Sequence, residues 1–158
     1  NTVVFKPSDM SYPLAIHLSS HLLGFENVNH TVDTIDIREN SRAAQKGDFL
    51  KDPFCLADRY DMVISNPPFS LALAFIQQAL RVVKPGGYVV MLLRLNFFGS
   101  RERNDFFLSG NMPDMSYVHA QRLGFTPDGG TDSIEYQHAI WRNTGEVCEE
   151  TKLRVLPY

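Results

Sequence analysis

Residues 61–69, Asp-Met-Val-Ile-Ser-Asn-Pro-Pro-Phe, join a short apolar run to two consecutive prolines. The run Met62–Ile64 is typical of a buried strand. Because proline fixes φ and donates no backbone N–H, the two prolines end this strand in one stiff turn, and Pro67 keeps Asn66 out of the helical region. We therefore expect Asn66 at the carboxyl end of a strand, where open α/β sheets bind their ligands.

The polar groups of this turn suit one kind of chemistry. The Asn66 amide oxygen and the Pro67 carbonyl can each accept a hydrogen bond from a planar –NH2 group. The ring of Phe69 offers a face on which a base can stack. Together these groups would orient an amino nitrogen and leave its lone pair free to attack. The structural alternative is a proline-terminated strand with a surface asparagine, because Asn-Pro-Pro also occurs by chance.

Strand and helix patterns alternate along the first two thirds of the chain. Apolar periodicity and turn residues predict strands at 2–5, 32–37, 61–65 and 88–95, a short strand end at 47–50, and helices at 12–23, 41–45, 71–83 and 101–108. Ser70 is the expected cap of the 71–83 helix, and Lys84-Pro85-Gly86-Gly87 is expected to end it in a tight turn. This alternation predicts a parallel α/β sheet.

The last third of the chain predicts a different pairing. Residues 116–121 and 135–142 read as strands, and the Gly/Asp/Thr-rich stretch 126–133 lies between them. No helix fits in that connection, so the two strands should pair antiparallel. We expect one domain over 1–142 and a polar C-terminal tail over 143–158.

Composition limits the classes of function. A chain of 158 residues with 44% hydrophobic and 21% charged residues is long enough for one globular core. The net charge of −3 argues against a strongly basic nucleic-acid coat, so a nucleic-acid substrate would have to meet a local basic patch or an added domain. Cys55 and Cys148 form no metal or redox motif, which favours a reduced cytoplasmic location. We expect no membrane association, since no apolar run reaches spanning length.

The histidines have no ligand spacing, and we expect satisfied or surface side chains and no metal site. They are His17, His21, His30, His119 and His138. The chain opens at Asn1 without a methionine, which favours a natural N-terminus that begins earlier.

Asn66-Pro67-Pro68-Phe69 resembles the catalytic tetrapeptide of S-adenosylmethionine-dependent amino-methyltransferases, above all the DNA adenine-N6 enzymes. Over roughly 32–142 the chain also resembles small phage-encoded adenine methyltransferases, through the segments 92–97 and 125–136 and Trp141. The resemblance implies a Rossmann-like class I methyltransferase sheet, mostly parallel and closed by a C-terminal antiparallel hairpin. It implies catalytic roles for Asn66, Pro67, Pro68 and Phe69.

The same resemblance implies a site for S-adenosyl-L-methionine. An acid that ends the second strand accepts from the cofactor ribose in this family, and Asp36 matches it, with Asp33 as a weaker candidate. Asp48 matches the family's acceptor for the adenine amino group, and Phe49 matches the apolar residue that packs on the adenine. Pro7 and Ser8 match part of the first cofactor turn.

The stretch that follows the 88–95 strand carries basic and aromatic residues. Arg94, Asn96, Arg101 and Arg103 are expected to bind the substrate, because arginine binds phosphate and neighbouring aromatic rings can stack on an extruded base. The alternative is a loop whose phenylalanines anchor it to the core and whose arginines are solvated.

These residues imply methyl transfer to adenine N6 in DNA, with the base flipped out of the duplex and with an auxiliary recognition subunit or domain as a further partner. RNA guanine-N2 and protein glutamine-N5 methyltransferases would use the same tetrapeptide and remain alternatives. A catalytically silent methyltransferase fold that acts as a binding module is an alternative of another class.

One element departs from the family. Its first turn should be rich in glycine, which lets the backbone approach the cofactor, and an acid should begin it. Here the turn reads Lys6-Pro7-Ser8-Asp9-Met10-Ser11-Tyr12. Three explanations stay open: cofactor binding was lost, the turn binds through Ser8 and Asp9, or residues of the natural chain are absent between Ser8 and Tyr12. We favour the third.

Overall fold

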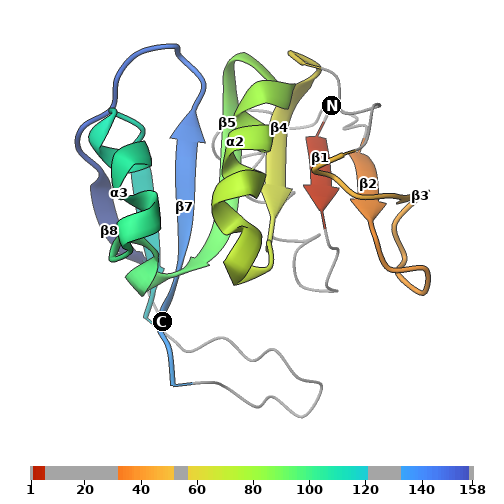
Figure 1. Cartoon of the computed structure of the whole chain (residues 1–158), viewed down its shortest axis with the longest axis horizontal. Coiled ribbons are helices and arrows are strands. Elements are labelled where there is room, and N and C mark those ends of the chain that lie inside the picture. Colours follow the sequence, from red (N-terminus) through yellow and green to blue (C-terminus); the bar gives the residue numbers. More distant parts are fainter. Residues whose placement is uncertain (1, 6–31, 52–56, 121–132, 157–158) are drawn as a thin grey trace.

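The computed structural model describes residues 2–5, 32–51, 57–120 and 133–156, with the backbone alone for 2–5 and 32. The described strands form an eight-stranded sheet in the order β3-β2-β1-β4-β5-β7-β6-β8 (Figure 1). In chain order the elements are β1 (Thr2–Phe5), β2 (Val32–Asp36), β3 (Gln45–Lys46), β4 (Tyr60–Ser65), η1 (Phe69–Leu71), α2 (Ala72–Val82), β5 (Val83–Arg94), η2 (Leu95–Phe98), α3 (Arg101–Leu108), β6 (Met115–His119), β7 (Tyr136–Arg142) and β8 (Lys152–Leu156).

Strand pairing confirms the predicted fold class. The neighbouring strands from β3 to β5 all pair parallel. β7 runs antiparallel to both β5 and β6, which is the predicted C-terminal hairpin. β1 lies between β2 and β4, so successive strands are added on one side of β1 up to β3 and on its other side from β4 onward. Open α/β sheets bind ligands at such a switch point, beyond the carboxyl ends of the strands.

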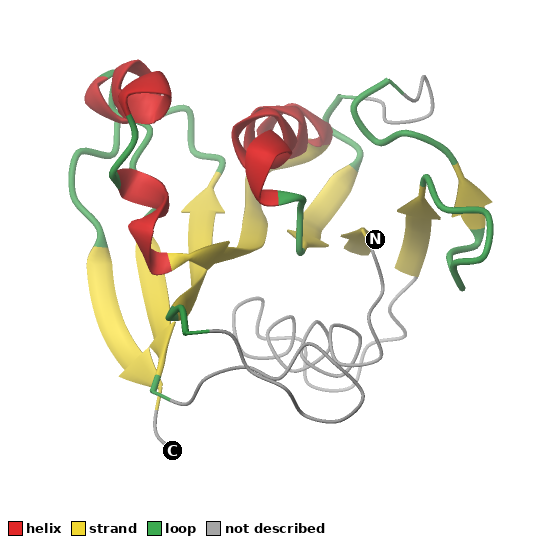
Figure 2. Cartoon of the chain, turned by 60° about the horizontal axis from the view of Figure 1, so that its bottom comes forward, coloured by secondary structure: helices red, strands yellow, loops and turns green. Residues whose placement is uncertain are grey.

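The main core lies between the sheet and its helices. α2 and α3 cover the same face of the sheet (Figure 2). α2 presents one buried stripe to this face, made of Ala72, Ile76, Ala79 and Val82. The strand residues of this cluster alternate along the chain, as in Val89, Met91 and Leu93, because successive strand side chains point to opposite faces. Each large aliphatic side chain buried here contributes about 1.5–3 kcal/mol.

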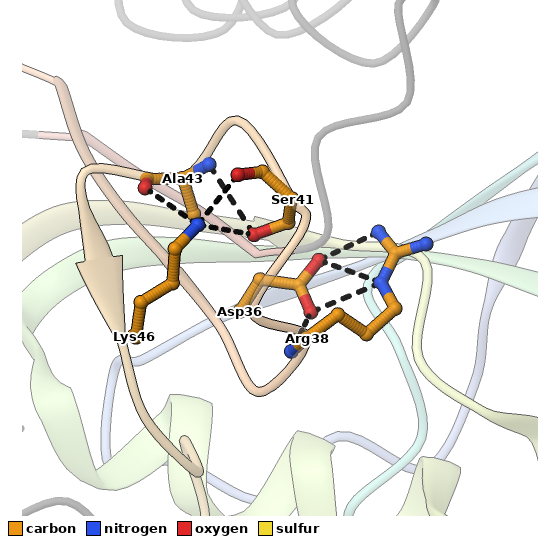
Figure 3. Close-up of polar contacts among 5 residues, drawn as sticks. All are labelled: Asp36, Arg38, Ser41, Ala43 and Lys46. Atoms are coloured by element: carbon orange, nitrogen blue, oxygen red, sulfur yellow. Dashed lines mark hydrogen bonds and ion pairs between the residues drawn. The ribbon is translucent and has the colours of Figure 1, made fainter.

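The helix predicted at 41–45 is wrong, because the backbone groups of this segment bind elsewhere. The Lys46 ammonium donates to the Ser41 carbonyl (2.5 Å), to Ser41 Oγ (2.9 Å) and to the Ala43 carbonyl (3.2 Å) (Figure 3). The Ala44 N–H donates to Thr34 Oγ1 at 2.7 Å. The segment therefore forms a bent loop, and the short strand lies at Gln45–Lys46, just before the 47–50 stretch where we expected it.

Both ends of the α2 region differ from the prediction. Ser70 does not cap the helix, because it lies inside η1 and the N-cap is Leu71. The Lys-Pro-Gly-Gly stretch lies within β5 instead of forming a separate turn before it. Between the pairs Tyr60↔Val83 and Met62↔Tyr88, β4 advances two residues and β5 advances five, so this stretch is a bulge. Gly86 has a φ of 80°, which favours glycine.

The segment 143–158, expected as a polar tail, contributes strand β8, which pairs parallel with β6. Its alternating Lys-Leu-Arg-Val-Leu pattern is short and lies just after two glutamates. The polarity of this segment therefore predicted a tail and not a strand. Leu153 and Val155 remain 60% and 62% exposed. The predicted helix at 12–23 and the first cofactor turn lie outside the described residues. Among the described residues, the structure contains no helix with the length and apolar character of a membrane span.

Candidate active site

The carboxyl ends of β1, β2 and β4 lie close to one row across the sheet, and β5 continues three residues past it. Strand register aligns Ile35 of β2, Phe5 of β1, Ser65 of β4 and Met91 of β5. Asp36 and Asn66 each lie one residue beyond this row. β1 separates their strands, so their backbones are about 10 Å apart, which is two strand spacings. Two residues that the sequence predicted for one site therefore share one edge of the sheet, on either side of the switch point.

The Asn-Pro-Pro-Phe turn leaves β4 as the prolines dictate. Pro67 is buried, Pro68 is extended with φ −55° and ψ 131°, and the Pro68 carbonyl accepts the Leu71 N–H at 2.9 Å. This bond starts η1 and leaves the Pro67 carbonyl outside the helical turn. Asn66 is half-buried, and among the described residues no hydrogen-bond partner reaches its carboxamide. The turn thus holds an amide at the sheet edge with its donors and acceptor available.

Phe69 lies against side chains from two other strands. The Cζ of Arg94 lies 4.2 Å from the centre of the Phe69 ring. The ring centre of Tyr136 lies 6.0 Å from that of Phe69, with the planes inclined at 38°. Phe69 is half-buried and Tyr136 is 3% exposed. The ring of the tetrapeptide is therefore fixed by contacts that its own turn does not supply.

Asp36 is buried and paired with a neighbour that the sequence analysis missed. Arg38 Nε donates to both carboxylate oxygens, at 3.2 and 3.1 Å, and Arg38 Nη2 donates to Oδ2 at 2.7 Å (Figure 3). The Arg38 backbone N–H donates to Oδ1 at 2.9 Å. The side chain of Asp36 is 4% exposed and that of Arg38 is 52% exposed. The carboxylate raises the pKa of Arg38 above its ordinary value. A basic residue two positions after a strand-end acid was the available signal.

Asp33, the weaker candidate, lies toward the opposite end of β2. Its Oδ2 accepts from the Tyr60 hydroxyl at 3.2 Å and lies 3.6 Å from Arg59 Nη2. Ligands bind at the carboxyl end of such strands, so position favours Asp36.

Asp48 lies at the surface, whereas the ring of its neighbour Phe49 is packed in the core. Asp48 Oδ1 accepts the Leu50 N–H at 3.1 Å, and its side chain is 29% exposed. Phe49 is 4% exposed and packs on Phe75 of α2, with ring centres 5.3 Å apart. Asp48 can therefore accept from a ligand at the surface, whereas the Phe49 ring is largely occupied by the core.

The polar residues at the end of β5 and just after it fall into two groups, those that contact aromatic rings and those that face solvent. Arg103 stacks on Phe97 with its Cζ 4.4 Å from the ring centre, and its Nε donates to the Phe97 carbonyl at 2.6 Å. Asn96 and Arg101 are exposed. Arg94 and Arg103 therefore act on aromatic rings of the protein, and Asn96 and Arg101 face solvent. Pro7 and Ser8 lie outside the described residues.

Two of the histidines form a pair, which the sequence analysis did not foresee. His119 Nε2 and His138 Nδ1 lie 2.7 Å apart across β6 and β7. The two residues are far apart in the chain, and only the hairpin brings them together. Burial, and then the charge of His119, lower the pKa of His138 from 6.5 to about 3. Burial also lowers the pKa of His119. The pair is thus neutral above pH 6.5.

This pair predicts a loss of stability in mild acid. Below pH 6.5 the unfolded chain protonates this histidine, whereas folded His138 stays neutral until about pH 3. The free energy of unfolding should therefore fall as the pH drops from 7 to 5, by up to about 1 kcal/mol per pH unit. Urea unfolding at pH 7, 6 and 5 measures this slope, which His138→Gln should flatten. His119→Gln, which removes a less buried ring, should change it less. Equal slopes for wild type and His138→Gln would contradict the assignment.

The mostly parallel sheet is that of the class I methyltransferase fold, as the comparison with solved structures shows. No family model and no curated protein sequence matches the chain. A protein from Listeria monocytogenes assigned to the class I S-adenosylmethionine-dependent methyltransferases is similar in structure, with 17% identity and a TM-score of 0.63 over 98% of this chain and 58% of that one.

Two restriction-enzyme proteins are also similar in structure. For the EcoKI M protein of a type I restriction enzyme the identity is 13% and the TM-score 0.62, over 98% of this chain and 44% of that one. A protein from Vibrio vulnificus YJ016 is assigned as the modification subunit of a type I restriction enzyme. Its identity to this chain is 14% and its TM-score is 0.57, over 99% of this chain and 43% of that one. This chain spans about half the length of these structures, and the likeness establishes its fold.

Proposed function

We propose that this chain is the catalytic domain of an S-adenosylmethionine-dependent methyltransferase that acts on an exocyclic amino nitrogen, with N6 of adenine in DNA as the acceptor. One observation carries the proposal. The Asn66 carboxamide, without a partner among the described residues, lies at the switch point of a class I methyltransferase sheet and is followed by Phe69 in one fixed turn. A strand that merely needed to end would not require an asparagine there.

The described residues fit S-adenosylmethionine by the chemistry of their acceptors. The buried carboxylate of Asp36 would accept from the ribose hydroxyls, and that of Asp48 from the adenine amino group. Ser65 Oγ, at the end of β4, is buried and has no hydrogen-bond partner in the described part of the chain. An unpaired buried hydroxyl is costly, which fits a ligand at this edge. Pro7 and Ser8 would complete the cofactor site.

The residues of the tetrapeptide would orient the acceptor. When bound, S-adenosylmethionine supplies an electrophilic methyl group on a sulfonium and leaves as a thioether. Asn66 Oδ1 and the Pro67 carbonyl accept from the two N–H bonds of the amino group, which helps the nitrogen to become tetrahedral as its lone pair attacks. Phe69 stacks on the base, and the nitrogen then releases one proton to solvent. Most of the rate gain comes from holding the reacting atoms in line.

DNA is the favoured acceptor for two reasons. The EcoKI M protein belongs to a type I restriction enzyme, and the Vibrio vulnificus protein is assigned as the modification subunit of one. Asn96 and Arg101 are exposed and follow Arg94 closely in the chain, and such side chains can contact phosphate. The net charge of −3 leaves most DNA contacts to an auxiliary subunit or a further domain.

A silent methyltransferase fold is the second candidate, and the pairing of Asp36 favours it. Arg38 occupies both carboxylate oxygens that the ribose would use. A fold that no longer binds the cofactor would tolerate such a pair without loss.

Calorimetric titration with S-adenosylmethionine separates the two candidates. We expect saturable one-to-one binding by protein whose intact mass matches the printed sequence. Binding would be followed by assays of DNA, RNA and protein acceptors with tritiated cofactor, and label in adenine N6 of DNA is the expected product. No binding by the folded protein would reject the enzyme and support the silent fold.

A further inference from the structure

The ring of Phe69 is stacked on a guanidinium from another strand. Arg94 is the last residue of β5, and its Cζ lies 4.2 Å from the ring centre. A cation within about 6 Å of an aromatic ring centre is attracted by the negative face of the ring. The guanidinium therefore occupies one face of Phe69, and a planar acceptor can stack only on the part of the ring that Arg94 and Tyr136 leave open.

The backbone of Arg94 is held in place from β7. Arg94 pairs with Tyr136 in the β5–β7 register, and the next residue, Leu95, donates its N–H to the Glu135 carbonyl at 2.9 Å. The Arg94 carbonyl accepts from Nε2 of Gln137 at 3.4 Å. Gln137 is fully buried and its Oε1 accepts from Ser116 Oγ at 2.5 Å. The backbone of Arg94 is thus fixed in the sheet. A residue that orients another side chain needs such a fixed backbone.

We propose that Arg94 is a positioning residue for methyl transfer: by stacking on Phe69 it fixes the plane of the ring against which the acceptor base lies. This inference rests on the proposed function. It assigns Arg94 to the tetrapeptide and leaves phosphate binding to exposed groups such as Arg101. The Phe69 side chain is half-buried, and without the guanidinium only Tyr136 of these two neighbours would remain against its ring. The ring would then be held less firmly, and fewer bound bases would have their nitrogen in line.

Positioning and phosphate binding predict different kinetics. An arginine that binds phosphate raises the KM for DNA when removed, and it lowers the salt dependence of binding by about one unit of slope. An arginine that orients the ring lowers kcat at saturating DNA and leaves the KM and the salt dependence nearly unchanged.

The matched control is a second arginine–aromatic stack on the same two strands. Arg142 of β7 lies over Tyr88 of β5, with its Cζ 5.8 Å from the ring centre. These residues pair at the opposite end of the β5–β7 ladder from Arg94 and Tyr136. Arg142→Gln removes the same charge and the same type of contact far from the site, so its activity should equal that of wild type.

The experiment compares Arg94→Gln, Arg94→Lys and Arg142→Gln with wild type, on DNA from a host without DNA methyltransferases. Arg94→Gln should lower kcat about tenfold and change the KM for DNA less than about twofold. Arg94→Lys retains a cation and should recover kcat to within about threefold of wild type. A raised KM with unchanged kcat, or equal kcat for all four proteins, would overturn the inference.

A fluorine probe reads the contact without activity. With 4-fluorophenylalanine at position 69, the ¹⁹F resonance should shift in Arg94→Gln and stay in place in Arg142→Gln. An unshifted resonance in Arg94→Gln would show that no stack exists in solution. If wild type methylates no acceptor while the resonance shifts, the proposed function fails and the stack is structural. An active wild type with normal Arg94→Gln kinetics would remove the positioning role alone.

Discussion

Asn66→Ala is expected to nearly abolish methyl transfer, with a loss of kcat of about 100- to 1,000-fold. The substitution removes the acceptor that orients the amino nitrogen at the moment its bonding changes, so the loss falls on the chemical step and not on cofactor affinity. Little stability should be lost, because the carboxamide is half-buried and has no partner among the described residues. Tritium transfer to DNA, calorimetry with S-adenosylmethionine and thermal unfolding measure the three quantities separately.

Asn104→Ala is the matched control for this substitution. Asn104 is an exposed residue of α3 with no role in the proposed chemistry, and alanine suits a helix interior. It should retain wild-type activity. Unchanged activity of Asn66→Ala, or an unfolded Asn66→Ala protein, would remove Asn66 from the mechanism.

The second large effect concerns Asp36 and Arg38, whose substitutions should act in opposite directions. Asp36→Ala removes a carboxylate that would accept from two ribose hydroxyls, and hydrogen bonds to charged groups contribute about 1.5–3 kcal/mol each. We expect its affinity for S-adenosylmethionine to fall about 100-fold or more. Arg38→Ala removes the guanidinium from the same carboxylate and keeps the backbone N–H that donates to Oδ1. Because half-exposed ion pairs contribute less than about 1 kcal/mol, the affinity should rise only a few-fold.

Calorimetry on wild type and both variants gives these affinities. Arg81→Ala, which changes an exposed arginine in the last turn of α2, controls for loss of positive charge and should bind as wild type does. Weaker binding by Arg38→Ala would mean that Arg38 orients Asp36 for the ligand instead of competing with it. Equal affinities for Asp36→Ala and wild type would place the ribose elsewhere.

Local sequence predicted the parts of the fold that local physics controls. The apolar run of β4 and the two prolines after it fix the strand, its end and the exit of the chain, since proline acts on its own φ and on the residue before it. Asp36 could be placed at the end of β2 in the same way. The predicted β6–β7 hairpin followed from the lack of a helical sequence pattern between its two strands.

Elements that depend on distant partners were missed or misplaced. Helix propensity at 41–45 gave way to Lys46 and Thr34, which bind the backbone groups of that loop. β8 forms by pairing with the edge of β6. Its own sequence is too polar to predict a strand. Secondary-structure propensity depends on neighbouring residues alone, so it cannot predict either of these contacts.

Local sequence is therefore enough to identify and place the tetrapeptide, because its prolines act through adjacent bonds. The residues that surround the tetrapeptide depend on long-range pairing. Strand order brings Asp36 to the same edge, the β5–β7 pairing sets Arg94 and Tyr136 against Phe69, and the hairpin joins His119 to His138. These contacts depend on sheet register between segments far apart in the chain, which no local pattern specifies.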